Sequence, residues 1–178
     1  MAKPEAPVLE TERLILRRRQ QRDVPRMLQA YQDERIRRYL GGHPPKDSAS
    51  LTQLVRKRTP VEWAITLRGE DLYIGECTIN RVVDSYLGEL GYLLLREYWG
   101  QGYAFEAARA VLDCASDRLH LGRMYALIDA ANARSIRLAE RLDFERVALL
   151  PEANFGGRVA DMVYYSRKLP GREWPPVP

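Results

Sequence analysis

The chain has few of the residues that build metal sites or disulfide frameworks. Its 178 residues include two cysteines and two histidines, and none of the four has partners at metal-ligand spacing. Cys77 falls in an expected strand and Cys114 in the apolar part of an expected helix. We therefore expect two reduced, small core side chains rather than a disulfide or a nucleophile, and no metal.

Long apolar runs are also missing. No segment approaches ~20 uninterrupted apolar residues, and the first residues lack the apolar run of a signal peptide, so we expect a cytoplasmic protein with no membrane partner. Residues 1–8 and 170–178 are rich in proline, which favours irregular tails. The sequence has no internal repeat, and its length suits one domain, residues 1–178, with its own core.

A long basic run interleaved with aromatic residues is likewise absent. The formal net charge of +4 and the pI near 9.2 suit an anionic partner, whether a cofactor phosphate or RNA, but do not choose between them. Without a basic run, nucleic-acid binding is not expected to be the main role.

The most informative stretch runs from Ser85 to Leu119. It predicts a strand over Leu87–Leu95, a loop, and a helix whose apolar residues recur at spacings of three and four. The loop contains Trp99, Gly100, Gln101, Gly102, Tyr103 and Ala104. Glycines allow a ligand to approach the backbone closely, and the free N–H groups of a first helical turn favour an anion. A tight turn with nothing bound would show the same spacing.

Two common phosphate-binding motifs do not fit this loop. A dinucleotide fingerprint needs a third glycine where the chain has Phe105, and its acidic residue, Asp129, comes later than usual. A Walker A motif needs a Gly-Lys-Ser/Thr that does not follow.

The order of expected elements predicts an α+β fold. Short turns join strands at 61–68, 72–83 and 87–95, which makes them antiparallel neighbours. Four more strands are expected, at 13–18, 123–129, 145–150 and 159–169, and helices are expected after Asp23, from Asp33, and at 47–58, 105–119 and 133–142.

The sequence resembles the GNAT family of acyl-CoA-dependent N-acetyltransferases, in particular its RimJ/RimL branch, which acetylates the N-termini of ribosomal proteins. The matching pieces follow the family's order over roughly residues 9 to 169: 9–17, 91–92, 98–104, 106–107, 132–135, 141–144, 161 and 164–166. This resemblance implies a GNAT-like fold, a mixed and mostly antiparallel sheet of about seven strands flanked by helices. It also implies acetyl-CoA as co-substrate and direct transfer of acetyl to a primary amine in a ternary complex, with a protein N-terminal α-amine as the expected acceptor.

The resemblance also implies roles for the loop and its neighbours. Residues Trp99–Ala104 would hold the cofactor pyrophosphate, and the backbone of Leu94 would pair with the pantetheine arm. Asn132 would cap a helix and contact the pantetheine. The loop departs from the common pattern, which has Arg or Gln where this chain has Trp99.

Two residues are expected to carry the chemistry. Glu89 stands where several family members keep a glutamate that accepts the amine proton through water, a role suited to a partly desolvated carboxylate. Its alternative is an exposed strand glutamate. Ser135 stands where the resembled branch has a serine facing the cofactor sulfur, which would hydrogen-bond or protonate the departing thiolate. Its alternative is a bond to a carbonyl of its own helix.

Several alternatives stay open at this stage. Tyr92, Tyr125 and Tyr164 are unranked candidates for a phenol acid. The acceptor is not fixed by the sequence, so a small amine such as an aminoglycoside, polyamine or amino acid, or a different acyl group, remains an alternative. A non-catalytic acyl-CoA-binding or RNA-binding module is a further one. Exposed late strands would allow a homodimer.

Overall fold

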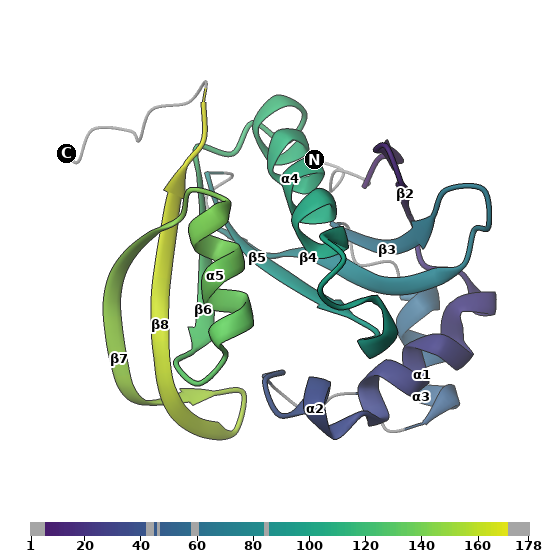
Figure 1. The fold of residues 1–178 in the computed structure, drawn as a ribbon, viewed down its shortest axis with the longest axis horizontal. Helices are drawn as coiled ribbons and strands as arrows, with labels where there is room; N and C mark the ends of the chain where they lie inside the picture. Colours follow the sequence, from purple (N-terminus) through teal and green to yellow (C-terminus); the bar gives the residue numbers. More distant parts are fainter. Residues whose placement is uncertain (1–5, 42–44, 46, 58–60, 84–85, 171–178) are drawn as a thin grey trace.

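The computed structural model describes residues 6–41, 45, 47–57, 61–83 and 86–170. Within these residues eight strands form one mixed sheet in the order β1-β2-β3-β4-β5-β6-β8-β7 (Figure 1). The strands are β1 Leu9–Glu10, β2 Leu14–Arg17, β3 Glu62–Leu67, β4 Tyr73–Val83, β5 Leu87–Leu94, β6 Arg123–Asp129, β7 Glu145–Phe155 and β8 Arg158–Lys168. Neighbours are antiparallel except β5 and β6, which are parallel.

Five α-helices and two short 3₁₀ turns complete the described part of the chain. They are η1 Gln21–Asp23, α1 Val24–Gln32, α2 Glu34–Arg37, α3 Ser48–Arg56, η2 Arg96–Tyr98, α4 Tyr103–Asp117 and α5 Ala133–Arg141. The starts of α2, α3 and α5 are capped by the side chains of Asp33, Asp47 and Asn132, which accept backbone N–H bonds from the first turn. No helix in the described ranges is long and apolar enough to cross a membrane.

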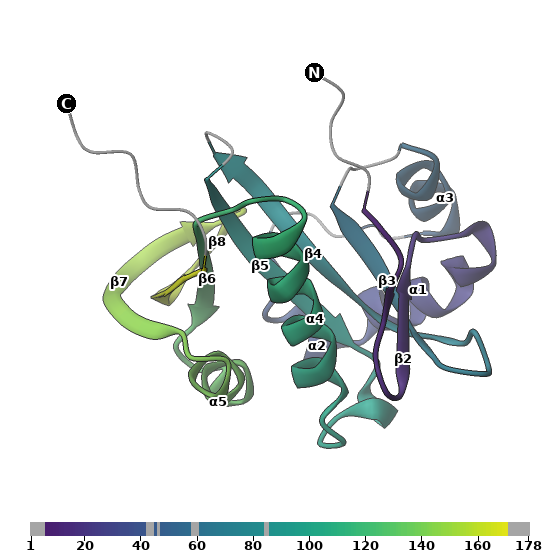
Figure 2. The same ribbon diagram turned by 90° about the horizontal axis from the view of Figure 1, so that it is seen from above.

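The helices lie in two layers, one on each face of the sheet (Figure 2). α4 and α5 pack on one face, where Ala108 and Ala139 share a cluster with Leu94 of β5. The helices α1–α3 pack on the other face around Met27 and Leu93. Because side chains alternate along a strand, even-numbered residues of β5 face α4 and odd-numbered ones face α1.

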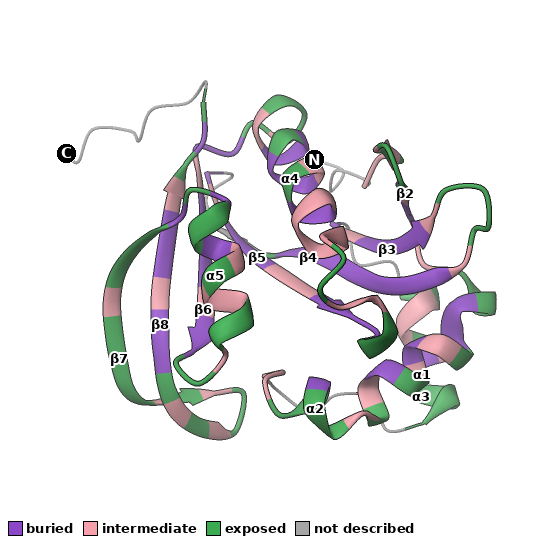
Figure 3. Cartoon of the chain, in the orientation of Figure 1, coloured by how far each residue is buried: buried purple, intermediate pink, exposed green. Residues whose placement is uncertain are grey.

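Burial falls off toward the late edge of the sheet (Figure 3). β3 and residues 73–79 of β4 are almost entirely buried, whereas β7, the edge strand, is mostly exposed and presents Val147 and Leu149 to solvent. Most of the hydrophobic stabilisation therefore comes from the centre of the sheet.

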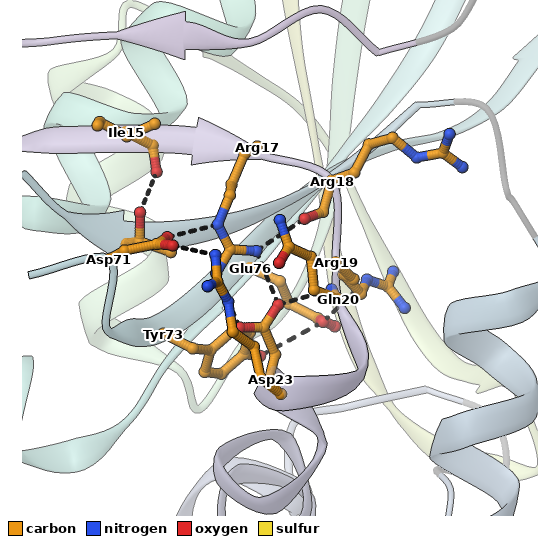
Figure 4. Close-up of polar contacts among 11 residues, drawn as sticks. Ile15, Arg17, Arg18, Arg19, Gln20, Asp23, Asp71, Tyr73 and Glu76 are labelled. Carbon is orange, nitrogen blue, oxygen red and sulfur yellow. Dashed lines mark hydrogen bonds and ion pairs between the residues drawn. The ribbon is translucent and has the colours of Figure 1, made fainter.

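A buried ion network fixes α1 to the first strands (Figure 4). Arg17 donates two bonds to Asp23, at 2.8 and 2.9 Å, and a third to Asp71 at 2.6 Å. Arg19 lies 3.4 Å from Glu76, which also accepts a bond from Tyr31. Removing one member would leave a buried charge uncompensated, which typically costs several kcal/mol, so the network specifies where α1 docks.

The sequence-based fold is confirmed, with local differences. An eighth strand, β1, precedes the seven expected ones, and β7 continues to Phe155, so the last hairpin is longer than expected. Asp23 precedes α1 as expected, but its carboxylate binds Arg17 and the Gln20 N–H instead of capping. The end of the expected helix at residue 58, part of the turn expected between the strands at 72–83 and 87–95, and most of the expected tails lie outside the described residues, while residues 6–8 form no helix or strand.

Candidate active site

The centre of the sheet opens where β5 and β6 part. Their parallel register covers three pairs and ends at Glu89 opposite Tyr125. Beyond it β5 stays with β4 and β6 stays with β8, so the two strands diverge, as Figure 1 shows. We call this region, from Leu90 to Leu94 on β5 and from Ala126 to Asp129 on β6, the strand split.

The strand split leaves backbone groups of β5 without a strand partner. The Leu95 N–H donates to the carbonyl of Ile74 in β4 and therefore points away from the split. Backbone direction alternates along a strand, so Tyr92 and Leu94 direct their N–H and C=O groups toward the split. The Leu94 carbonyl accepts a 2.8 Å bond from the Trp99 indole. The Leu94 backbone is predicted to pair with pantetheine, but its carbonyl already accepts this hydrogen bond from Trp99.

Glu89 lies on the α1 side of the split and is buried, with 8% of its surface exposed. The Tyr125 hydroxyl donates to its Oε2 at 3.3 Å, and the ring of Tyr125 lies 5.7 Å from that of Tyr164. The exposed-glutamate alternative for Glu89 is therefore wrong. This arrangement places a carboxylate and two aromatic rings together, which are the groups that recognise an amine.

Tyr92 and Ser135 lie on the opposite, α4 and α5 side. The Tyr92 hydroxyl oxygen is buried and has no hydrogen-bond partner of full geometry among the described residues. Burial raises the pKa of Tyr92 to about 12, although hydrogen bonding to the nearby Ser135 hydroxyl lowers the same pKa in part. An unsatisfied buried phenol is costly, so a missing polar partner is expected beside Ser135. Of the three unranked tyrosines, Tyr92 is the one that the fold brings to Ser135.

The glycine loop lies at the N-terminus of α4. Gly100 and Gly102 have φ values of +75° and +83°, a left-handed conformation that favours glycine. No side chain caps α4, so its first N–H groups point outward with the positive end of the helix dipole. Tyr103 and Ala104, expected in the loop, form the first helical turn. The loop is therefore suited to an anionic group.

Cationic and aromatic side chains hold this loop in place. Arg13 binds Glu106 at 2.6 Å, donates to the Gln101 carbonyl at 3.0 Å, and lies 4.5 Å from the ring centre of Tyr103. From α5, Arg134 stacks 4.6 Å over Trp99. Two separate segments thus brace the loop, and the sequence alone gave no signal of the Arg13 contacts.

Asn132 acts first as a helix cap. Its Oδ1 accepts the Ser135 N–H at 3.2 Å, which fixes the backbone of Ser135 at the start of α5. Its predicted contact with pantetheine stays a prediction.

The α1 side of the split is bridged at its outer end. Phe155, near the tip of the β7–β8 hairpin, packs against Gly41, where an added Cβ would come within 2.4 Å of the ring. The Tyr39 hydroxyl donates to the Ala131 carbonyl at 3.4 Å. Both contacts join the segment around α2 to the second half of the sheet.

A separate shallow pocket lies on the outer surface of α1 and α2. Its lining includes Gln29, Asp33 and Arg96, and Asp33 lies 3.8 Å from Arg96. No predicted site residue lines it, so it does not belong to the strand split.

The sequence analysis did not predict one polar pair that lies near the split. Asp129, at the end of β6, binds Nη1 of Arg158 at 2.6 Å. The two residues are 29 positions apart in the chain, and only the pairing of β6 with β8 brings them together.

Comparisons with known proteins bear on the family and the fold. Residues 13–145 match the family model described as "Acetyltransferase (GNAT) domain". A relative named N-acetyltransferase p20, from Bacillus licheniformis, is 29% identical over 168 residues, which cover 89% of this chain and 94% of the relative.

Two solved structures share the fold. A spermidine N-acetyltransferase from Vibrio cholerae, in complex with CoA and spermine, has a TM-score of 0.77 and 20% identity, over 89% of this chain and 96% of that one. RimL, a ribosomal L7/L12 alpha-N-protein acetyltransferase in complex with coenzyme A, has a TM-score of 0.78 and 16% identity, over 92% and 98%.

Proposed function

Because the chain belongs to the acetyltransferase (GNAT) domain family, we propose that it transfers an acetyl group from acetyl-CoA to the N-terminal α-amine of a protein, as RimJ/RimL-type enzymes do. The observation that carries the proposal is the strand split, with Glu89 and Tyr125 on one side and Tyr92 and Ser135 on the other. An amine and a thioester can meet only where the sheet opens between two such sets of groups.

The residues present fit acetyl-CoA. The uncapped start of α4 and its two left-handed glycines suit a pyrophosphate. The inward-facing backbone groups of β5 suit an amide-bearing arm, and the orphaned Tyr92 hydroxyl requires a polar partner beside Ser135. Trp99, Gln101 and Asn132 would hold the cofactor through the loop backbone and the start of α5.

Acetyl-CoA supplies the activated acetyl thioester. Glu89 accepts the proton that the acceptor amine gives up as its nitrogen bonds to the acetyl carbon, and Tyr125 orients the carboxylate. Ser135 Oγ donates a hydrogen bond or proton to the sulfur as the carbon–sulfur bond breaks. The Tyr92 hydroxyl, next to Ser135, is a second hydrogen-bond donor for the sulfur.

The charges around the split favour a protein N-terminus over a polyamine. Glu89 is the carboxylate beside the two aromatic rings, whereas Asp129 is neutralised by Arg158. The exposed face of α2 adds Arg35, Arg37 and Arg38. A polycation would be repelled by these arginines, while an acceptor with one ammonium group and a peptide chain would not.

A small primary amine is the second candidate. The observation that favours it is the bridge formed by Phe155 on Gly41 and by Tyr39 on Ala131, which narrows the approach from the α1 side.

An acceptor screen with purified protein tests the proposal. Acetyl-CoA is offered with short peptides bearing a free N-terminus, with the same peptides blocked at the N-terminus but containing lysine, and with spermidine. CoA release is followed and products are located by mass spectrometry. We expect acetylation of free N-termini only. Turnover confined to spermidine or to lysine side chains would contradict the proposed acceptor, and binding of no acyl-CoA would contradict the enzyme assignment.

A further inference from the structure

Within the described part of the chain, Arg158 at the start of β8 has two buried donors without a hydrogen-bond partner. Its Nη1 binds Asp129, but Nε and Nη2 are buried and have no hydrogen-bond partner among the described residues. Leaving such groups unpaired is costly, and more so when the group is charged. The free pair is one edge of a planar fork, the geometry that binds a carboxylate through two parallel bonds.

Asp129 positions this fork, and each of its two carboxylate oxygens accepts a hydrogen bond. Its Oδ1 accepts the Ala131 N–H at 2.7 Å and its Oδ2 accepts Arg158 Nη1 at 2.6 Å. With 9% of its surface exposed, Asp129 is held in a fixed rotamer. Arg158 is therefore held through Nη1 on one side, while its buried Nε and Nη2 have no hydrogen-bond partner among the described residues on the other.

The fork lies on the acceptor side of the strand split. Tyr125 and Asp129 are four residues apart on β6, so their side chains project from the same face of the sheet, the face that carries Glu89. Arg158 pairs with Phe155, the residue that packs on Gly41. At about 3.3 Å per residue, Asp129 lies about 13 Å along the strand from the place where Glu89 would receive the amine.

We infer that Arg158 binds a side-chain carboxylate of the acceptor peptide, near its fifth residue. This inference rests on the proposed function. An extended peptide also advances about 3.3 Å per residue, so when the amine of the first residue lies beside Glu89, four further steps of the peptide place the fifth residue beside Arg158. A free amino acid is too short to reach both groups, and a polyamine would bring a second cation against the guanidinium.

Peptide kinetics with the whole chain test the inference. Seven-residue peptides with a free N-terminus and an amidated C-terminus carry one glutamate at each position from two to six, against a matched glutamine series. For the unmodified enzyme we expect kcat/KM to peak near position five, about 10- to 100-fold above the glutamine peptide, as for a hydrogen-bonded charge pair. A flat profile would overturn the inference.

Variants separate recognition from folding. Arg158→Gln should flatten the profile through KM, and Arg158→Lys should restore it only in part because a single ammonium lacks the fork. Since Arg158→Gln leaves Asp129 unpaired, the double variant Arg158→Gln/Asp129→Asn provides the folded comparison. Arg146→Gln, on the exposed face of the same hairpin, should retain the peak.

The two proposals fail in different ways. An equal fall in kcat/KM for all peptides in Arg158→Gln, or an unchanged peak in kcat/KM in the double variant, would overturn the role of Arg158 but not the proposed function. Turnover of spermidine with no turnover of any peptide would overturn both this inference and the proposed acceptor.

Discussion

Tyr125 donates a 3.3 Å hydrogen bond to Oε2 of Glu89, and the two residues form the last pair of the parallel register between β5 and β6. The bond therefore holds a buried carboxylate at the point where the sheet opens. The bond restricts the orientation of the carboxylate that we propose as the acceptor of the amine proton.

Glu89→Gln should reduce kcat by about 10²- to 10⁴-fold, the usual contribution of a general base. Acetyl-CoA affinity should be unchanged, because Glu89 lies on the acceptor side of the split. Steady-state kinetics and calorimetric titration measure the two quantities. Glu70→Gln, exposed in the β3–β4 turn, is the control, and an unaltered kcat in Glu89→Gln would exclude the base role.

Tyr92→Phe should separate stability from catalysis. Removing a buried unsatisfied hydroxyl should stabilise the free protein by about 1 kcal/mol, which raises Tm by about 2–4 °C in a chain of this size. The same change should lower kcat by about tenfold, the worth of one hydrogen bond.

A double-mutant cycle with Ser135→Ala tests whether the two hydroxyls act together. We expect the second substitution to cost little once the first has been made. Independent, additive losses would show that Tyr92 does not act through Ser135, and a lower Tm in Tyr92→Phe would show that its hydroxyl has a structural partner.

Gly102→Glu should abolish acetyl-CoA binding, because it adds both strain and negative charge to the anion-binding loop. Its matched control is Gly69→Glu, in the β3–β4 turn, where φ is +88° and no atom lies within 4 Å of an added Cβ. Both variants should lose about 1–2 kcal/mol from left-handed strain, but only Gly102→Glu should lose the ligand in a calorimetric titration. Similar affinities in the two variants would place the pyrophosphate elsewhere.

Low pH should weaken the contacts of Thr11 and Arg13 with Glu106, which hold the glycine loop in place. Burial alone would raise the pKa of Glu106, but hydrogen bonds from Thr11 and Arg13 outweigh it, and the pKa lies below its ordinary value. This stabilisation is complete above the unfolded pKa, near 4.3, and is lost as the pH falls through the lower folded value.

Urea unfolding of the parent and of Glu106→Gln between pH 7 and pH 3 measures this contribution. We expect the variant to be less stable at pH 7 and the difference to shrink below about pH 4. Arg13→Gln should show a similar loss at pH 7. A difference that grows in acid would contradict the assigned contacts.

The family and its chemistry could be predicted from short motifs because they depend on local backbone requirements. Gly100 and Gly102 are needed for the left-handed turn before α4, and Asn132 for the cap of α5. Such requirements are visible in a few consecutive residues. The GNAT family, the α+β fold and acetyl-CoA as co-substrate are confirmed, whereas the protein N-terminus as acceptor, the RimJ/RimL subtype and the roles of Glu89 and Ser135 stay predictions.

The arginines illustrate what could not be predicted. The side chains of Arg17 and Arg19 are buried in ion pairs with Asp23, Asp71 and Glu76, although the sequence shows only three consecutive arginines at positions 17 to 19. Their partners lie up to 57 positions away in the chain, and no local pattern distinguishes a buried arginine from a solvated one.

The sequence by itself determined the elements, their order and the loop at the start of α4, because hydrophobic periodicity, glycines and caps act over a few residues. Only the tertiary structure decided which polar groups meet. The parallel pairing of β5 with β6 sets Glu89 beside Tyr125, the packing of α5 on the sheet sets Ser135 beside Tyr92, and the pairing of β6 with β8 sets Asp129 beside Arg158. These contacts depend on strand register and burial, which are settled when the whole sheet packs.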